Sequence, residues 1–424
     1  MSSRLLTALR APRIVVGTTI ALSVTVSVAA CAEEADAPDI GSLAAGELDG
    51  WTALHEQPHE SVLAYDQVAV ASTDGVLAWL TRAGESGAAL SVWTSADGDT
   101  PVETPVVMPG GVAIPVALAA DPAGWSGVAV TRDDPDGANT GLVAWRSPEE
   151  GSAAPGGNGP GSAGGAATTD PAPEGLRLPE AGVPGVVTAA RAAGVDVVAG
   201  VAGGEVVTWV SGAEGWTAGT PELDVDGGVV NSRVGGTGDR FLLAAVDATG
   251  APYLWTSTDG FAWTAIPVEA PDASLAAVGI VTGVGPSDAG EGLVAWLVGE
   301  PSATEVPREA AEVVVQRVEG TTITDAGTIS AGDDGTALVD VNAAARRGEW
   351  LVIGGARVGD GGAVRPGLWA SAGGEWAQSA QADLVDQSDS EFRALDGGAD
   401  GLLYGVITGR SSIDVDVWRS AGER

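Results

Sequence analysis

Short apolar runs, each opening on a glycine turn, recur along most of the chain. They are rich in Val, Leu and Ala with occasional aromatic residues, and they are bounded by Gly and Asp. Runs of this kind are typical of buried β-strands rather than of helices. Seven of them begin at Gly75, Gly124, Gly194, Gly238, Gly292, Gly348 and Gly401. After the first thirty residues no stretch has a 3.6-residue period, so the pattern predicts an all-β fold.

The tripeptide Trp-x-Ser recurs in phase with these runs. Its copies begin at Trp93, Trp145, Trp209, Trp255, Trp369 and Trp418. They are spaced by 52, 64, 46, 114 and 49 residues; the interval of 114 is twice 57, and the absent copy is expected near Val313-Val314-Val315-Gln316. A self-similar unit of about 50 residues has room for four short strands. Seven such units predict a seven-bladed β-propeller of four-stranded antiparallel blades.

The expected order of strands within a blade also predicts how the ring closes. We expect the first strand innermost, the second at the glycine-apolar run, the third at Trp-x-Ser and the fourth outside. The chain ends on a third strand, Val415 to Ser420, whereas Glu47 to Leu54 is similar in sequence to an outer strand. We therefore predict that the N-terminal strand completes the last blade and hides two sheet edges.

One hairpin carries a family resemblance. Ser257-Thr258-Asp259-Gly260-Phe261-Ala262-Trp263 resembles the Asp-box (BNR) hairpin of sialidase-like propellers, with its glycine one residue early. The resemblance covers residues 48–424 through degenerate motifs. It implies a turn between the third and fourth strands in which Ser and Asp bind backbone groups and Trp fills the space between strands. The hairpin is a marker of the fold and lies away from any active site in that family.

The first thirty residues have the pattern of an export signal. Arg4, Arg10 and Arg13 precede an uncharged run from Ile14 to Ala30, which is short for a membrane span. Its end, Val28-Ala29-Ala30-Cys31, resembles the lipobox of bacterial lipoproteins. The resemblance implies cleavage before Cys31, a lipid on its sulfur, and a location on the outer face of the bacterial cytoplasmic membrane. An ordinary secretory leader is the alternative.

Composition then divides the chain into segments. Residues 1–30 are the predicted lipoprotein signal peptide, residues 31–46 an acidic flexible tether, and residues 47–424 the propeller. Residues 149–175 are rich in Gly, Ala and Pro and contain no large apolar side chain. Such a stretch buries too little apolar surface to order itself, so we expect a disordered loop within the second blade.

The charge and the single cysteine exclude several kinds of partner and chemistry. The net charge is −37, and removing the three arginines of the leader gives about −40. A surface this acidic repels nucleic acid and anionic lipid headgroups, so the membrane is reached only through the N-terminal lipid. Because Cys31 is the only cysteine, the mature chain has no disulfide, no thiolate nucleophile and no cysteine metal site. We expect a monomer without a cofactor.

Two patterns resemble metal sites without meeting their requirements. His55-Glu56-Gln57-Pro58-His59 matches H-E-x-x-H, but zinc binding by that motif needs a helix, and Pro58 stands in its interior. A weak surface metal site or a solvated loop remains. Three acidic clusters lack the ligand spacing of a calcium loop and are read as β-turns; they are Asp133–Gly137, Asp224–Gly227 and Asp333–Gly335.

Four arginines are the candidate ligand-binding residues. Each follows the glycine of its second strand by seven to nine residues, at the start of the loop to the third strand; they are Arg82, Arg132, Arg357 and Arg410. In propellers these loops share a face with the connections from fourth to first strands, where ligands usually bind. Since arginine grips carboxylate or phosphate through paired hydrogen bonds, convergence would make an anion site. The alternative is solvated strand ends. Arg191, Arg233 and Arg346 are expected near the opposite face.

The function that these features predict is a lipid-tethered, non-enzymatic binding module or assembly platform for a protein or an envelope polymer. The alternative is a sialidase-like or other glycan-active glycoside hydrolase. In the sialidase family, catalysis needs an arginine triad, a tyrosine nucleophile with a glutamate partner and an acid/base aspartate. Only Tyr65, Tyr253 and Tyr404 are available, and no Tyr–Glu pair is placed at the mouth of the ring.

Overall fold

A computed structural model gives the conformation of the β-rich part of the chain. By contacts between residues the chain divides into two units, Met1–Ala37 and Pro38–Arg424, and all described residues belong to the second. They contain no apolar helix of bilayer-spanning length. The structure describes residues 52–57, 69–73, 76–83, 89–95, 102–106, 112–121, 124–132, 139–146, 176–177, 187–212, 215–219, 221–225, 227–269, 275–283, 291–299, 312–330, 337–358, 363–378, 390–397, 403–409 and 415–420.

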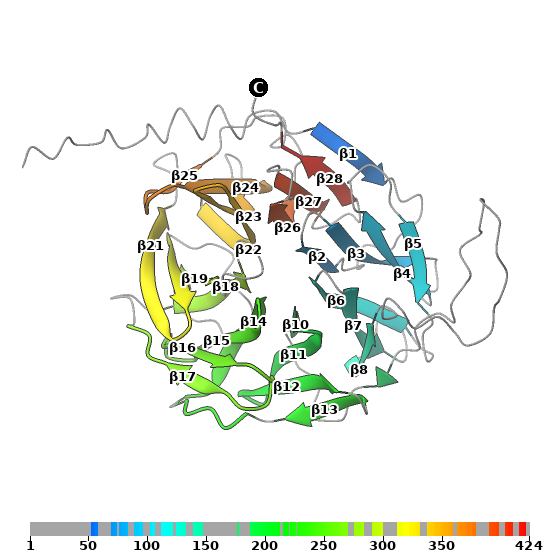
Figure 1. Ribbon diagram of the computed structural model, residues 1–424, viewed down its shortest axis with the longest axis horizontal. Coiled ribbons are helices and arrows are strands. Elements are labelled where there is room, and N and C mark those ends of the chain that lie inside the picture. The colour runs from blue at the N-terminus through cyan, green and yellow to red at the C-terminus, as the bar shows by residue number, and fades with distance from the viewer. Residues whose placement is uncertain are drawn as a thin grey trace, which may run out of the picture. The chain divides into compact units, whose positions relative to one another are not determined.

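These residues form seven four-stranded antiparallel sheets, with their first strands nearest the middle of Figure 1. The first strands are β2 (Ala69–Thr73), β6 (Val112–Asp121), β10 (Val187–Ala192), β14 (Val229–Thr237), β18 (Leu275–Gly283), β22 (Ala337–Arg347) and β26 (Ser390–Gly397). The second strands are β3 (Val76–Ala83), β7 (Gly124–Arg132), β11 (Val195–Ala202), β15 (Arg240–Asp247), β19 (Glu291–Val298), β23 (Trp350–Val358) and β27 (Leu403–Gly409).

The outer half of each sheet consists of its third and fourth strands. The third strands are β4 (Ala89–Ser95), β8 (Asn139–Arg146), β12 (Glu205–Gly212), β16 (Pro252–Ser257), β20 (Glu312–Glu319), β24 (Val364–Ser371) and β28 (Val415–Arg419). The fourth strands are β5 (Val102–Val106), β9 (Leu176–Arg177), β13 (Gly215–Gly219), β17 (Thr264–Ile266), β21 (Thr322–Ser330), β25 (Ala377–Gln378) and β1 (Thr52–Gln57).

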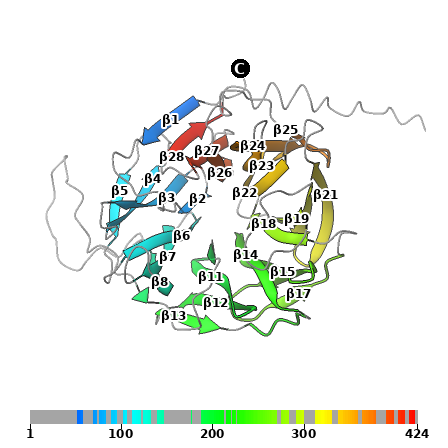
Figure 2. The ribbon, with the colours of Figure 1, turned by 180° about the vertical axis from the view of Figure 1, so that it is seen from behind.

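The sheets are arranged around a common axis. Each first strand packs against the first strand of the next sheet along the chain, and β26 packs against β2. The same order is seen from both sides, in Figure 1 and Figure 2. Four-stranded antiparallel sheets repeated radially in this way are a β-propeller. The predicted all-β propeller is confirmed.

The tryptophans of the Trp-x-Ser repeats lie on third strands, as predicted. Trp145, Trp209, Trp255 and Trp369 are buried there between sheets. The serine has a role of its own. In two sheets its hydroxyl oxygen accepts a hydrogen bond from the backbone at or near the start of the second strand: Ser211 from Asp196 N–H at 2.6 Å, and Ser420 from Leu403 N–H at 2.9 Å.

The sheet without Trp-x-Ser keeps a tryptophan on a different strand. Its third strand is β20, which contains the predicted segment Val313 to Gln316. Trp296 of the second strand, β19, is fully buried and donates its indole N–H to the Gln316 side-chain oxygen at 2.8 Å. In this sheet the buried indole therefore comes from the second strand rather than the third. Gln316 accepts a hydrogen bond from its N–H, the only polar group of the indole.

The Asp-box hairpin adopts the turn that the resemblance implied. The Asp259 carboxylate accepts the backbone N–H groups of Phe261 and Ala262 at 2.9 and 2.8 Å, and the Trp263 indole donates to the Gly260 carbonyl at 3.0 Å. Gly260 has φ +75°, and a Cβ there would lie 2.5 Å from Val197 of the neighbouring sheet. The hairpin therefore needs glycine at this position for both conformation and space.

Backbones of adjacent first strands approach closely where glycine allows it. A Cβ on Gly235 of β14 would lie 2.1 Å from the Val281 carbonyl oxygen of β18. A Cβ on Gly236 would lie 2.4 Å from the Arg191 carbonyl oxygen of β10. One strand thus touches both neighbours through positions that have no side chain, and this close packing joins sheets that share no backbone ladder.

The N-terminal strand β1 pairs antiparallel with β28, from Thr52 opposite Arg419 to Gln57 opposite Val415. It is the fourth strand of the sheet whose first three strands come from the C-terminal end of the chain. The predicted signal peptide with Cys31, the tether at 31–46 and the loop at 149–175 lie outside the described residues.

Candidate functional site

Three of the four predicted arginines occupy equivalent places on second strands. Arg82 is next to last in β3, Arg132 is last in β7, and Arg357 is next to last in β23. Second strands of a propeller run in one direction, so these ends share one face, which we call the loop face. Arg410 and the side chains of Arg82 and Arg132 lie outside the described residues.

Arg357 is the one member of the set whose side chain can be followed. In the orientation that satisfies the Gln378 amide, its oxygen accepts hydrogen bonds from Arg357 Nη1 at 3.0 Å and Nε at 2.9 Å. Gln378 belongs to β25, the outermost strand of that sheet. The Arg357 guanidinium is therefore directed outward along the sheet, away from the axis, and the binding role of the four arginines stays a prediction.

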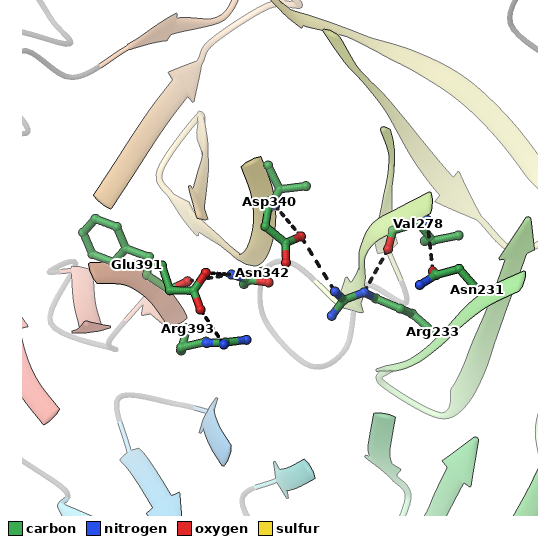
Figure 3. Close-up of polar contacts among 9 residues, drawn as sticks. Asn231, Arg233, Val278, Asp340, Asn342, Glu391 and Arg393 are labelled. Carbon is green, nitrogen blue, oxygen red and sulfur yellow. Dashed lines mark hydrogen bonds and ion pairs between the residues drawn. The ribbon is translucent and has the colours of Figure 1, made fainter. Parts of the chain in front are cut away.

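Polar side chains of the first strands form a network of contacts between neighbouring sheets (Figure 3). On β14, the Asn231 amide oxygen accepts the Val278 N–H at 3.2 Å, and Arg233 Nε donates to the Val278 carbonyl at 2.9 Å. Arg233 Nη2 also lies 3.7 Å from Asp340 Oδ1. Two side chains of β14 thus form hydrogen bonds with the backbone N–H and carbonyl of Val278 on β18. The Arg233 side chain also extends to Asp340 on β22.

The same arrangement continues from β22 to β26. Asn342 Nδ2 donates to Glu391 Oε2 at 3.4 Å and to the Phe392 carbonyl at 3.2 Å. Glu391 is also ion-paired with Arg393, whose side chain is 40% exposed while that of Glu391 is 2% exposed. We call Asn231, Arg233, Asp340, Asn342, Glu391 and Arg393 the polar belt. It links the first strands of four consecutive sheets.

Two members of the polar belt lie at β-bulges. The pairing of β22 with β23 skips Asn342, and the pairing of β26 with β27 skips Arg393. An extra residue of this kind leaves the ladder and turns its side chain away from the regular alternation. Asn342 donates a hydrogen bond to the Glu391 carboxylate and Arg393 is ion-paired with it, so both bulged residues contact the same group.

The polar belt was not predicted, although the sequence carries a signal for it. Each contributing strand carries two polar residues separated by one: Asn231-Ser232-Arg233, Asp340-Val341-Asn342 and Glu391-Phe392-Arg393. In a regular strand, residues two apart share a face, as Asn231 and Arg233 do, whereas the bulges at Asn342 and Arg393 interrupt the alternation and are not marked by it. Arg233, expected near the face opposite the loop face, lies instead in the middle of β14 as part of the belt.

Arg191 and Arg346 do lie toward the opposite face, where first strands turn into second strands. Arg191 Nη1 and Arg146 Nε lie 2.8 and 2.6 Å from the carboxylate of Asp196, which is almost fully buried. Arg346 Nη2 lies 2.6 Å from Glu291 Oε2 on the preceding sheet. Each buried carboxylate is thus held by an arginine from a neighbouring sheet, and the arginines join sheets there.

Tyr253, one of the three available tyrosines, packs against a tryptophan of its own strand. Its ring stacks on Trp255 with 5.8 Å between centroids and 6° between planes, and its hydroxyl donates to Asp247 Oδ2 at 3.0 Å. Burial alone would raise the pKa of Asp247, but hydrogen bonds from Thr249, Ala251 and Tyr253 outweigh it, so the pKa is lowered. Tyr65 lies outside the described residues, and Tyr404 belongs to β27.

The H-E-x-x-H segment begins in a strand. His55, Glu56 and Gln57 belong to β1, whereas His59 lies outside the described residues. Because this segment begins in a strand, its residues do not have the helical spacing on which zinc binding by this motif depends. Within the part of the chain that the structure describes, three or more His, Cys, Asp or Glu side chains are nowhere grouped for a metal ion.

No protein-family model and no curated protein sequence matches the chain. Solved structures resemble it in fold. For YCF48 from Cyanidioschyzon merolae the TM-score is 0.46 at 14% identity, over 88% of this chain and 98% of that one. For the β-propeller domain of the trilobed protease from Pyrococcus furiosus it is 0.44 at 8%, over 84% and 95%. For a sialidase from Trypanosoma rangeli it is 0.41 at 12%, over 84% and 54%. At these identities the likeness concerns the fold alone.

Proposed function

We propose that this protein is a lipid-anchored β-propeller on the outer face of the bacterial cytoplasmic membrane and that it acts as a non-enzymatic binding module. Its ligand would be a protein or an envelope polymer. The polar belt is the observation that carries the proposal. Asp340 and Glu391, the belt's two carboxylates, face arginine and asparagine side chains that join neighbouring sheets. Groups used in this way hold a rigid scaffold rather than exchange protons with a substrate.

The scaffold in this proposal is a seven-bladed ring closed by its N-terminal strand. The pairing of Thr52–Gln57 with Val415–Arg419 and the packing of β26 against β2 support it. Closure by a strand from the opposite end of the chain leaves no sheet edge open at the seam. A tether attached to this strand would hold the ring close to the membrane.

The binding surface in this proposal is the loop face, with Arg82, Arg132, Arg357 and Arg410. Its support is the shared position of three of them at the ends of second strands. The protein has 20 arginines against 57 acidic residues, so a local gathering of arginine would stand out against a negative surface. Exposed charges farther away than about 8–10 Å are largely screened at physiological salt, so such a cluster can attract an anion.

Binding and hydrolysis can be tested on the full-length protein in detergent micelles. We expect saturable co-sedimentation with purified cell-wall material and no release of 4-methylumbelliferone from a sialoside. Arg82→Gln/Arg132→Gln should weaken sedimentation at an unchanged melting temperature, whereas Arg240→Gln/Arg347→Gln, which removes the same charge at the other ends of the sheets, should not. Turnover of the sialoside would favour the glycoside hydrolase alternative. Equal sedimentation by both variants would remove the loop-face arginines from the proposal.

A further inference from the structure

We propose that Arg393 is the ligand-contacting residue of a site at the axis of the ring, and that this site takes an uncharged, hydroxyl-rich saccharide. The inference rests on the proposed binding function, because the saccharide would be part of the envelope polymer. It differs from the anion site expected on the loop face in both the place and the charge of the ligand.

A β-bulge directs the Arg393 side chain away from the neighbouring sheets. Side chains along a regular strand alternate between the two faces of its sheet. β26 packs against β22 on one side and β2 on the other, so its regular positions point to these neighbours. The pairing of β26 with β27 passes from Phe392 to Ala394 and skips Arg393. A bulge can re-aim a side chain in this way, and bulges are frequent next to active sites.

The exposure of Arg393 indicates that its side chain reaches open space. Arg393 is the fourth of eight residues in β26, so it lies in the middle of an innermost strand rather than at a loop. Its side chain is nevertheless 40% exposed, although its neighbours Phe392 and Ala394 are buried. With other sheets on both sides and β27 behind it, such a side chain meets solvent on the inner side of the ring, at the axis.

Arg393 and Arg233 approach this space from different sides. Figure 3 shows their guanidinium groups directed toward one another, with Asp340 and Asn342 between them. The side chains of Arg233 and Asp340 are themselves partly exposed. Arg393 is held in place by its ion pair with buried Glu391, to which Asn342 also donates. A guanidinium fixed in this way loses less entropy when a ligand binds.

The charges beside the axis balance, which favours an uncharged ligand. Arg233 and Arg393 carry two positive charges, and each contacts one negative charge, on Asp340 and Glu391 respectively. An added anion would be repelled by both carboxylates, and an added cation by both guanidinium groups. An uncharged ligand avoids both repulsions.

Hydrogen-bonding groups that are only partly used favour a ligand with many hydroxyl groups. Arginine has five N–H donors, and a carboxylate has two acceptor oxygens. Among the described residues, Arg393 pairs with Glu391 alone, and Asp340 contacts only Arg233 and the Val341 N–H. Donors and acceptors thus both remain for a ligand. Since a hydroxyl group donates and accepts, the hydroxyls of a sugar match this mixed wall.

The other side of the axis is apolar. Across the middle of the ring from β22 and β26 lie β6 and β10, in both Figure 1 and Figure 2. From Val112 to Ala120, β6 contains only apolar residues, and the residue at its own bulge is the partly buried Val116. Apolar walls with a few placed polar groups are typical of small-molecule sites. A sugar ring, with C–H faces and hydroxyl edges, fits between the two.

Co-sedimentation of the full-length protein in detergent with purified cell wall tests the site. Hydrofluoric acid removes phosphate from the wall and carboxyl reduction removes acidic sugars, which leaves a neutral glycan. We expect the wild type to sediment with this neutral glycan and soluble fragments of the glycan to compete. Arg393→Lys keeps the positive charge beside Glu391 but loses the planar fork. It should raise the half-saturating glycan concentration about tenfold, the effect of losing about one hydrogen bond.

Arg317→Lys is the matched control. Arg317 is also paired with a buried glutamate, Glu291, and its side chain is 33% exposed. It belongs to β20, a third strand, and so lies away from the axis. This variant should change the half-saturating concentration by less than about twofold. Hydrogen exchange gives a second measurement on the wild type: the neutral glycan should slow exchange in β22 and β26 and leave β3 and β7 unchanged.

Three results would overturn the axial site. They are equal binding by Arg393→Lys and Arg317→Lys, competition by wall peptides instead of glycan fragments, and failure of the wild type to sediment with neutral glycan when it sediments with untreated wall. If in addition Arg82→Gln/Arg132→Gln weakens binding to untreated wall, the loop face stands without the axial site. A wild type that sediments with neither material contradicts the proposed function itself. If Arg393→Lys melts at a lower temperature, hydrogen exchange in the wild type decides.

Discussion

The guanidinium of Arg233 on β14 lies 3.7 Å from the carboxylate of Asp340 on β22, although β18 stands between those two strands. On the way, Arg233 Nε donates to the Val278 carbonyl of β18 at 2.9 Å. One side chain therefore joins three consecutive sheets (Figure 3). First strands of neighbouring sheets are not joined by backbone hydrogen bonds. Side-chain contacts of this kind therefore provide partners for backbone groups on the inner edges of these strands.

Removing Arg233 should destabilise the protein more than removing an arginine whose carboxylate partner is largely exposed. Arg233→Ala leaves the Val278 carbonyl without its donor and Asp340 without its cation, and losses of this type cost about 1–3 kcal/mol. Arg240→Ala, whose guanidinium pairs with a largely exposed Asp239, should change stability by about 0.5 kcal/mol or less. Equilibrium urea unfolding measures both. Equal losses would mean that the polar belt does not hold the sheets together.

Gly235 should not tolerate a methyl group. In Gly235→Ala the new Cβ would lie 2.1 Å from the Val281 carbonyl oxygen, so β14 and β18 must separate. Overpacking of this kind costs about 1–3 kcal/mol. Gly219→Ala is the control, since its Cβ would meet only Thr208 Oγ1 at 3.5 Å, an ordinary contact. Thermal unfolding compares the two, and a similar melting temperature for both variants would contradict the close approach.

The repeats predicted the fold well because they report local burial. Trp209 and Trp255 must lie on third strands for their indoles to fill the space between sheets, and a tripeptide is enough to mark that requirement. The polar belt was not predicted because its contacts join residues far apart in sequence. Alternation shows that Asn231 and Arg233 share a strand face. It does not show that Val278 and Asp340 lie opposite them, since that depends on the packing of whole sheets.

The four predicted arginines show the same limit, because the direction of a side chain depends on residues far apart in sequence. Spacing from a glycine placed Arg357 correctly at the end of its second strand. The direction of its side chain depends on Gln378, two strands farther out, and no local pattern marks that contact.

Stability should fall in acid in part through Asp247. Hydrogen bonds in the folded state lower the pKa of this carboxyl, so folding favours its charged form. Its contribution is therefore complete above the ordinary aspartate pKa of about 3.9 and is lost as pH falls toward the lowered value. Asp247→Asn should be less stable than the wild type at pH 7 and lose less stability between about pH 5 and pH 3. Urea unfolding across this range, with Asp239→Asn as the exposed control, measures the effect, and parallel curves for Asp247→Asn and the wild type would contradict it.

Lipid attachment and processing of the export signal should depend on Cys31. The lipobox interpretation of Val28-Ala29-Ala30-Cys31 predicts a lipid on this sulfur and cleavage just before it. Cys31→Ser should leave the protein unlipidated and either uncleaved or released from the membrane. Fractionation with intact-mass measurement is the test, and Ser23→Ala, within the apolar run, is the control. A membrane-retained Cys31→Ser protein with the mass of the wild-type mature form would disprove the lipoprotein interpretation.

If β1 closes the ring, as we propose, two truncations should differ sharply in stability. Deleting residues 32–46 removes only the predicted tether and should leave the melting temperature nearly unchanged. Deleting residues 32–56 also removes nearly all of the strand that pairs with β28 from Thr52 to Gln57. The outer edge of β28 would then have unpaired backbone groups, which invite pairing with other chains. We expect a lower melting temperature and aggregation in light scattering for the longer deletion only. Equal melting temperatures would show that β1 does not close the ring.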